Sequence, residues 1–173
     1  MRWSVRSAVP GDSESILAVV RDAFSTGGRD GHEEVEIVLD TWDLGAALPG
    51  LELVVDNEGR PVGHVLGARA RLNGREVAAV APLAVRTDRQ GEGIGTALMT
   101  EVIHRAEAAG YALIALLGLP EFYSRFGFEP AGPLGIVYPA VGPDHPHFLV
   151  RRLARYDATY RGDFVYCWES EED

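Results

Sequence analysis

Three glycines, Gly91, Gly93 and Gly95, occupy alternate positions just where a charged turn gives way to an apolar run with helical spacing. Free backbone amides at a helix N-terminus, together with the positive end of the helix dipole, attract anions. Glycines also leave room for a phosphate to approach. The stretch therefore indicates a pyrophosphate site, although a tight strand-to-helix connection without a ligand would use the same residues.

Two familiar phosphate-binding loops do not fit this stretch. The P-loop ends in Gly-Lys-Ser/Thr, whereas this loop ends Ile94-Gly95-Thr96, without a lysine. The dinucleotide fingerprint needs Gly-x-Gly-x-x-Gly after the first strand of a parallel unit, but the strands before this loop have antiparallel character. A nucleotide-binding regulatory domain is therefore disfavoured.

Apolar spacing predicts the elements that precede the loop. Residues 2–9 alternate like a strand, and residues 11–24 follow as a helix that begins at Asp12 or Ser13. After a glycine-rich break, residues 32–42 again have helical spacing, through Val35, Leu39 and Trp42. Residues 51–56, 61–72 and 77–85 then read as three antiparallel strands, with an Asn73-Gly74 turn between the last two.

The chain after the loop continues with alternating elements. An amphipathic helix begins at Ile94 and ends near Gly110, and a buried strand spans residues 112–118. A short helix starts near Pro120, and residues 130–146 form a loop rich in Pro and Gly. The predicted architecture is one domain over residues 1–173.

Composition narrows the classes of function. The chain has 173 residues, 46% of them hydrophobic, and a net charge of −10, which repels nucleic acid and suits a cationic partner. No apolar run reaches the ~18 residues of a membrane span, so we expect no membrane partner and a cytoplasmic protein. The single cysteine, Cys167, lies in the apolar segment 163–168 and is predicted to be an inert thiol in a buried strand.

Two motifs together carry a family resemblance. The stretch Gln90-Gly91-Glu92-Gly93-Ile94-Gly95 resembles motif A of the GNAT superfamily of acyl-CoA-dependent N-acetyltransferases. The segment from Tyr123 to Phe128 is similar to the family's Tyr-x-x-x-Gly-Phe. The close resemblance covers about residues 77–131, and it implies an α+β fold: a mostly antiparallel central sheet flanked by helices, with one splayed pair of strands.

The resemblance implies acetyl-CoA as co-substrate. Pro82 would interrupt the strand ladder and open a gap for the pantetheine arm, with the strand end Leu83, Ala84 and Val85 beside it. Arg89 would add a charge-assisted contact, although a solvated turn arginine fits as well. The amides expected to hold the pyrophosphate belong to Gln90, Gly91, Glu92, Gly93, Ile94, Gly95 and Thr96.

The resemblance also implies direct attack by a primary amine in a ternary complex, with the Tyr123 hydroxyl as general acid toward the CoA thiolate. A tyrosine that only packs between Phe122 and Phe126 is the alternative for this residue. At the level of the whole protein, the alternative is a catalytically degenerate acyl-CoA-binding or sensor module.

The amine must lose a proton, and the base is not obvious. The histone-acetylating relatives carry a glutamate in the fourth strand, whereas residues 77–85 contain no carboxylate. His32, Glu33 and Glu34 lie where the fold borders its acceptor pocket, although a solvated helix start would look the same. His64 could relay a proton or be a satisfied strand histidine.

Other features leave the acceptor open. The family's frequent asparagine before the short helix is replaced by Gly118-Leu119-Pro120, so one cofactor contact is absent or supplied by backbone. His145 and His147 flank a proline in a loop without further ligands, so no metal is expected. Peptides, amino sugars, polyamines and small metabolites all stay open as acceptors, and the protein is expected to be a monomer or homodimer.

Overall fold

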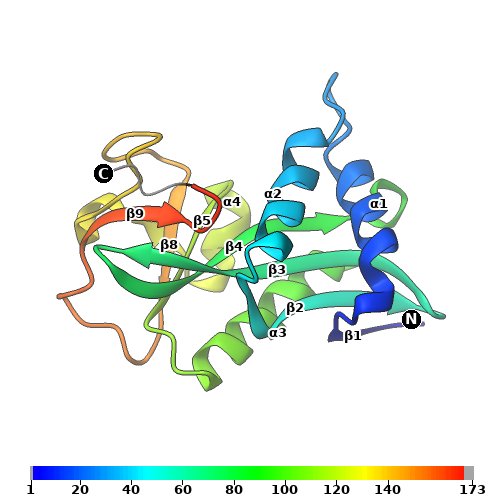
Figure 1. The fold of residues 1–173 in the computed structure, drawn as a ribbon, viewed down its shortest axis with the longest axis horizontal. Coiled ribbons are helices and arrows are strands. Elements are labelled where there is room, and N and C mark those ends of the chain that lie inside the picture. Colours follow the sequence, from blue (N-terminus) through cyan, green and yellow to red (C-terminus); the bar gives the residue numbers. More distant parts are fainter. Residues whose placement is uncertain (1, 170–173) are drawn as a thin grey trace.

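A computed structural model describes residues 2–169, in which a mixed sheet carries helices on both faces (Figure 1). Within these residues the main strand order is β1-β2-β3-β4-β5-β8-β6, and β9 pairs with both β3 and β7. Among the strand pairs of the described residues, only β4–β5 and β7–β9 are parallel. The strands are β1 (Trp3–Ser7), β2 (Ala47–Asn57), β3 (Arg60–Leu72), β4 (Arg75–Val85), β5 (Leu113–Leu117), β6 (Glu129–Pro130), β7 (Ile136–Val137), β8 (Phe148–Arg152) and β9 (Gly162–Tyr166).

Helices cover the two faces of this sheet. The helices are α1 (Ser13–Ala23), α2 (His32–Asp43), α3 (Ile94–Ala108) and α4 (Pro120–Tyr123). Helices α1 and α2 pack on one face, and α3 lies on the opposite one (Figure 1). The mixed sheet with helices on both faces is the predicted α+β class.

The predicted meander of three strands is confirmed. Strands β2, β3 and β4 pair antiparallel in sequence order. Asn73 and Gly74 join β3 to β4 with φ angles of 47° and 79°, the left-handed geometry that a two-residue hairpin turn requires. The local sequence was sufficient here because the turn chemistry and the strand periodicity agree.

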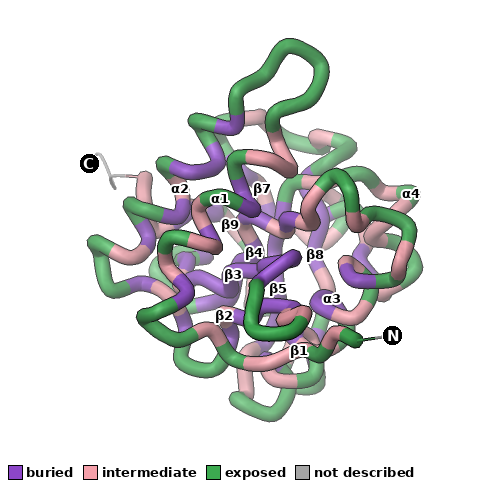
Figure 2. The backbone as a smooth tube through the Cα atoms, turned by 90° about the vertical axis from the view of Figure 1, so that its right-hand side faces the viewer, coloured by how far each residue is buried: buried purple, intermediate pink, exposed green. Residues whose placement is uncertain are grey.

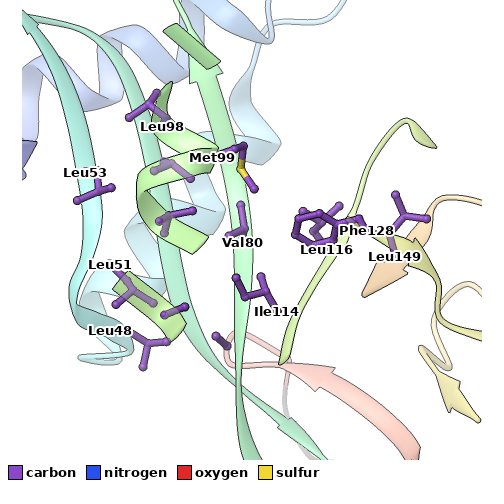
Figure 3. Close-up of a cluster of buried hydrophobic side chains, with 14 of the residues drawn as sticks. Leu48, Leu51, Leu53, Val80, Leu98, Met99, Ile114, Leu116, Phe128 and Leu149 are labelled. Carbon is purple, nitrogen blue, oxygen red and sulfur yellow. The ribbon is translucent and has the colours of Figure 1, made fainter. Parts of the chain in front are cut away.

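The largest core cluster lies between the sheet and α3. Leu98 and Met99 of α3 face β2, β4 and β5 in Figure 3. Gly63 of β3 permits this packing, because a Cβ there would lie 2.6 Å from Ile94 Cγ2. Buried backbone is concentrated in the central strands, whereas the connecting loops are mostly exposed (Figure 2). The sheet and α3 therefore form a tightly packed support for the loop that joins them.

Two sequence-based expectations need correction. The buried face of α2 contains Val35 and Val38, whereas Leu39 is 38% exposed, so the apolar face lies one residue earlier than predicted. Strand β9 ends at Tyr166, which places Cys167 just after the strand and half-buried rather than inside it. Burial raises the pKa of the Cys167 thiol, which favours its protonated form.

Candidate functional site

Strands β4 and β5 separate after a short paired region. Their register contains Ala78 opposite Ile114 and Ala79 opposite Ala115, and no later residue of β4 pairs with β5. The β3–β4 register also shifts, because Val80 and Leu83 pair with Gly67 and Val65. Two residues of β4, Ala81 and Pro82, thus stand opposite one residue of β3, and the predicted interruption at Pro82 is confirmed.

The glycine loop connects the splayed end of β4 to α3. Gly91 and Gly93 both have φ of +83°, a left-handed conformation that favours glycine, and α3 begins at Ile94 immediately afterwards. A cavity of about 520 Å³ lies in front of this helix N-terminus, and we call it the loop pocket. Its lining residues are Ala23, Phe24, Leu83, Val85, Arg89, Gln90, Gly91, Gly93, Ile94, Gly95, Thr96, Phe122 and Arg125.

Most of the predicted cofactor residues line the loop pocket, but two do not. Ala84 is buried on the other face of β4, in the cluster that packs against α1 and α2. Glu92 instead forms an ion pair with Arg89, with Nε of Arg89 2.7 Å from Oε2 of Glu92. The Arg89 guanidinium lowers the pKa of the Glu92 carboxyl. Arg89 therefore lines the pocket with part of its charge already engaged.

A second cation at the loop pocket was not predicted. Arg125 lines the pocket from the turn after α4, and its guanidinium carbon lies 4.9 Å from the centroid of the Phe122 ring. This contact holds the guanidinium end of the side chain over the Phe122 ring beside the pocket. The residue sits inside the Tyr-x-x-x-Gly-Phe segment, so its place in that motif was a usable signal.

A larger cavity of about 860 Å³ adjoins the first, and we call it the aromatic pocket. It extends from the splayed end of β4 to the turn after β5. The start of α2 and the aromatic residues Tyr138, Tyr166 and Trp168 line its other sides. The two pockets share Phe24, Leu83, Gln90 and Phe122, so they form one continuous cleft. The other lining residues are Glu33, Glu34, Ile37, Val80, Ala81, Pro82, Leu117, Gly118, Leu119, Tyr123, Tyr138, Tyr166 and Trp168.

Tyr123 ends α4 and lines the aromatic pocket beside the shared residues. Its ring packs edge-on against Phe122 and Phe128, with centroid distances of 4.9 and 5.7 Å. Phe126 contacts Phe122 instead, so the expected flanking role of Phe126 belongs to Phe128. Burial raises the pKa of Tyr123 to about 12.

Gly118 explains why the family's usual asparagine is missing here. A Cβ at position 118 would lie 2.2 Å from Cε2 of Tyr123, far closer than two carbon atoms can approach. The ring of Tyr123 thus occupies the space that a side chain at 118 would need. The two sequence features, Gly118 and the placement of Tyr123, depend on each other.

The acidic start of α2 contributes two of its three predicted residues to the aromatic pocket. Glu33 and Glu34 line it. Glu34 is only 8% exposed; its Oε1 accepts a hydrogen bond from Arg29, and its Oε2 is buried without a partner. His32 lines neither pocket; its side chain is 70% exposed, and its Nε2 lies 3.9 Å from Glu36.

His64 is buried away from the cleft. It is fully inaccessible to solvent, its Nε2 lies 2.8 Å from Oε2 of Glu52, and it lines neither pocket. The indole Nε1 of Trp42 donates to the same carboxylate. His64 is therefore a core residue that contacts Glu52 and not the cleft.

In the 145–147 loop His147 is exposed and His145 is half-buried, and their rings contact each other edge-on. Across residues 2–169, no group of three or more His, Cys, Asp or Glu side chains is placed to hold a metal ion. In the same part of the chain, no helix combines the length and apolarity needed to cross a bilayer.

The aromatic wall near the C-terminus was missed in the sequence. Tyr138, Tyr166 and Trp168 line the aromatic pocket although none of them belongs to either motif. Strand β9 brings the last two there by pairing with β3, through Tyr166 opposite Ala70. The only local signal was the aromatic content of residues 163–168, which predicts a strand but not its partner.

Comparisons with known proteins agree with this geometry. A family model for the acetyltransferase (GNAT) domain matches residues 50–130. Two Escherichia coli K12 proteins described as uncharacterized N-acetyltransferases are similar. YhbS is 33% identical over 129 residues, covering 73% of this chain and 74% of the relative. YjhQ is 36% identical over 137 residues, covering 76% and 72%.

Solved structures extend the similarity to the whole fold. The crystal structure of YhbS from Escherichia coli in complex with CoA has a TM-score of 0.85 and 31% identity, over 96% of this chain and 90% of that one. A GNAT family acetyltransferase from Brucella melitensis in complex with acetyl-CoA has a TM-score of 0.78 and 27% identity, over 95% of both chains. With its fold, its glycine loop and these relatives, the chain belongs to the GNAT family of N-acetyltransferases.

Proposed function

We propose that this acetyltransferase moves an acetyl group from acetyl-CoA directly to a primary amine within a ternary complex. One observation carries the proposal: the two pockets meet at Leu83 of the splayed β4 end and at Phe122, and Tyr123, next to Phe122, lines the aromatic pocket. A donor in the first pocket and an acceptor in the second would approach each other at this junction. Two relatives solved with CoA or acetyl-CoA support the choice of donor.

The loop pocket suits the pyrophosphate of the donor. Backbone amides from Gln90 to Thr96 surround the start of α3, where the helix dipole favours an anion. Arg89 and Arg125 add positive charge at the rim. The pantetheine arm would then run along Leu83 and Val85, whose backbone groups have no β5 partner.

The same splayed strand would stabilise the reaction's charged intermediate. Attack of an amine on a thioester places negative charge on the carbonyl oxygen, and a fixed backbone N–H aimed at that oxygen lowers the barrier. Unpaired backbone of β4 beside Pro82 is available for this purpose because the ladder is broken there. No covalent enzyme intermediate is then required.

Tyr123 would donate a proton to the departing thiolate. Its pKa of about 12 makes it a weaker acid than a tyrosine in water. Burial also raises the pKa of a thiol, so a CoA thiolate formed in the same desolvated place would be a stronger base. A hydrogen bond from the Tyr123 hydroxyl to the thiolate would then deliver the proton as the C–S bond breaks.

Tyr123→Phe tests the proposal because it keeps the ring and removes only the hydroxyl. We expect kcat, measured by thiol release with saturating amine, to fall about 100-fold. The acetyl-CoA dissociation constant and the melting temperature should change little. Tyr111→Phe is the matched control, since Tyr111 is partly buried but lines neither pocket.

Two results would count against the proposal. Wild-type kcat in Tyr123→Phe, with chemistry shown to be rate-limiting, would remove the acid role. Tight acetyl-CoA binding without thiol release for any amine would favour a catalytically inactive binding or sensor module instead.

A further inference from the structure

The aromatic pocket has an unusual balance of charge. Among the lining residues within the described range 2–169, Glu33 and Glu34 are the only ones with a charged side chain, and no Lys, Arg or His of that range lines it. The protein as a whole carries a net charge of −10. Local and global charge therefore both favour a cation in this pocket.

Glu34 offers that cation a specific partner. Its side chain is about nine-tenths buried, and one oxygen is held by Arg29 while Oε2 has no hydrogen-bond partner. A buried acceptor without a donor is unfavourable, and such atoms in native structures are usually satisfied by a ligand or an ordered water. An alkylammonium in the pocket would supply the missing donor.

The wall near the C-terminus offers a flat apolar surface. Trp168 stacks on Tyr166 with a centroid distance of 4.3 Å and an angle of 13° between the rings. Tyr138 meets Tyr166 edge-on at 5.2 Å. Rings that are already fixed by one another can receive a further aromatic group with little loss of side-chain freedom.

The same lining is poorly suited to a polyhydroxylated amine. An amino sugar needs a hydrogen-bond partner for each hydroxyl, and burying hydroxyl groups without partners costs free energy. Beyond the two carboxylates, the polar side-chain groups here are one amide, three phenols and one indole N–H. A volume of about 860 Å³ is enough for a small aromatic molecule beside the end of the donor.

From these observations we propose that the acceptor is an arylalkylamine, with its ammonium at Glu34 and its ring against Tyr166 and Trp168. This inference rests on the proposed function and names its acceptor class. The ammonium proton passes to Oε2 of Glu34, the oxygen that Arg29 does not hold, and this leaves a neutral amine. The freed nitrogen lone pair then forms the bond to the thioester carbon, and the C–S bond breaks. The departing thiolate takes a proton from Tyr123, and the second proton lost by the nitrogen restores the Tyr123 hydroxyl.

The first experiment measures kcat/KM by thiol release with 2-phenylethylamine, tryptamine, spermidine and glucosamine. We expect the two arylalkylamines to exceed spermidine and glucosamine by at least about 10-fold. In a calorimetric titration, 2-phenylethylamine is added to the protein saturated with CoA, and we expect the amine to bind. Calorimetry with acetyl-CoA alone reports separately on the proposed function.

Matched variants test the two halves of the recognition. Glu34→Gln should lower kcat/KM for 2-phenylethylamine by about 10-fold or more, whereas Glu36→Gln, the same change at an exposed position of α2, should not. Trp168→Leu should raise KM for the amine, whereas Tyr156→Leu, outside both pockets, should not. Acetyl-CoA affinity should stay unchanged in all four proteins.

The outcomes separate the inference from the proposed function. A preference for spermidine or glucosamine, or no calorimetric binding of 2-phenylethylamine, would overturn the arylalkylamine assignment while acetyl-CoA binding leaves the donor site standing. If the wild-type protein does not bind acetyl-CoA, the proposed function is overturned instead. Equal effects of Glu34→Gln and Glu36→Gln would remove Glu34 from acceptor recognition.

Discussion

At the scale of single residues, the site depends on positions where a side chain is absent. Gly118 leaves the space in which the Tyr123 ring lies, and Gly91 and Gly93 adopt left-handed backbone before α3. The loop glycines were identified from the sequence because their spacing and the following helix form a local pattern. The role of Gly118 was not identified from the sequence, because the Tyr123 ring, with which a side chain at 118 would clash, lies five residues away in a different element.

Gly118→Ala is expected to displace the Tyr123 ring. The new methyl group would lie 2.2 Å from a ring carbon, so the ring, or the backbone that carries it, must shift. Because small misplacements of a reacting group are costly, we expect kcat to fall about 10-fold or more while acetyl-CoA affinity stays within about 2-fold. Thiol release and calorimetry provide the two measurements.

Gly11→Ala is the matched control for this change. A Cβ at Gly11 meets no atom within 4 Å, and its φ is not in the left-handed range. Its kcat should equal that of the wild type. An unchanged kcat in Gly118→Ala would show that the ring can move aside without affecting the reaction, and would weaken the case for Tyr123.

At the scale of elements, local periodicity was sufficient for the helices and the meander but not for partners distant in sequence. The buried face of α2 was placed one residue away because Glu34, a buried acid, occupies a position where an apolar residue is normally expected. The wall formed by Tyr166 and Trp168 depends on β9 reaching β3 across about ninety residues of chain. Neither the burial of Glu34 nor the pairing of β9 with β3 produces a periodic pattern in the sequence.

Three elements meet at one partly buried carboxylate, and this contact predicts a stability change. Glu52 of β2 accepts from Trp42 of α2 and lies 2.8 Å from Nε2 of His64 in β3. Glu52→Ala leaves Nε1 of Trp42 and Nε2 of His64 without this partner. The free energy of unfolding should therefore fall by about 1–3 kcal/mol in urea titrations.

An exposed ion pair is the comparison for this variant. Glu58 contacts Arg2 at 3.0 Å with both side chains mostly in solvent, so Glu58→Ala should change the unfolding free energy by less than about 1 kcal/mol. Neither variant should alter acetyl-CoA affinity, because neither residue lines the cleft. Equal losses of unfolding free energy in the two variants would show that the Glu52 contacts stabilise the protein no more than an exposed ion pair does.

At the scale of the whole molecule, the cleft joins two pockets of different electrostatic character. The loop pocket has arginines at its rim and a helix N-terminus, whereas the aromatic pocket is lined by two carboxylates. A polyanionic donor must approach a protein of net charge −10, and a cationic acceptor is drawn toward it. The overall charge was visible in the sequence, but its division between the pockets required the fold.

This division predicts opposite salt dependences for the two substrates. Long-range forces are screened beyond a Debye length of roughly 10 Å at 0.1 M ionic strength, whereas contacts inside a pocket are screened less. Raising NaCl from about 0.01 to 0.15 M should therefore increase the association rate of acetyl-CoA in stopped-flow measurements, since repulsion by the net charge weakens first. Over the same range kcat/KM for 2-phenylethylamine should fall, because the attraction of its ammonium to the acidic protein is lost.

Potassium acetate at equal ionic strength controls for specific effects of chloride. An acetyl-CoA association rate that drops steeply with salt would mean that Arg89 and Arg125 outweigh the charge of the whole molecule, and that steering is local to the loop pocket.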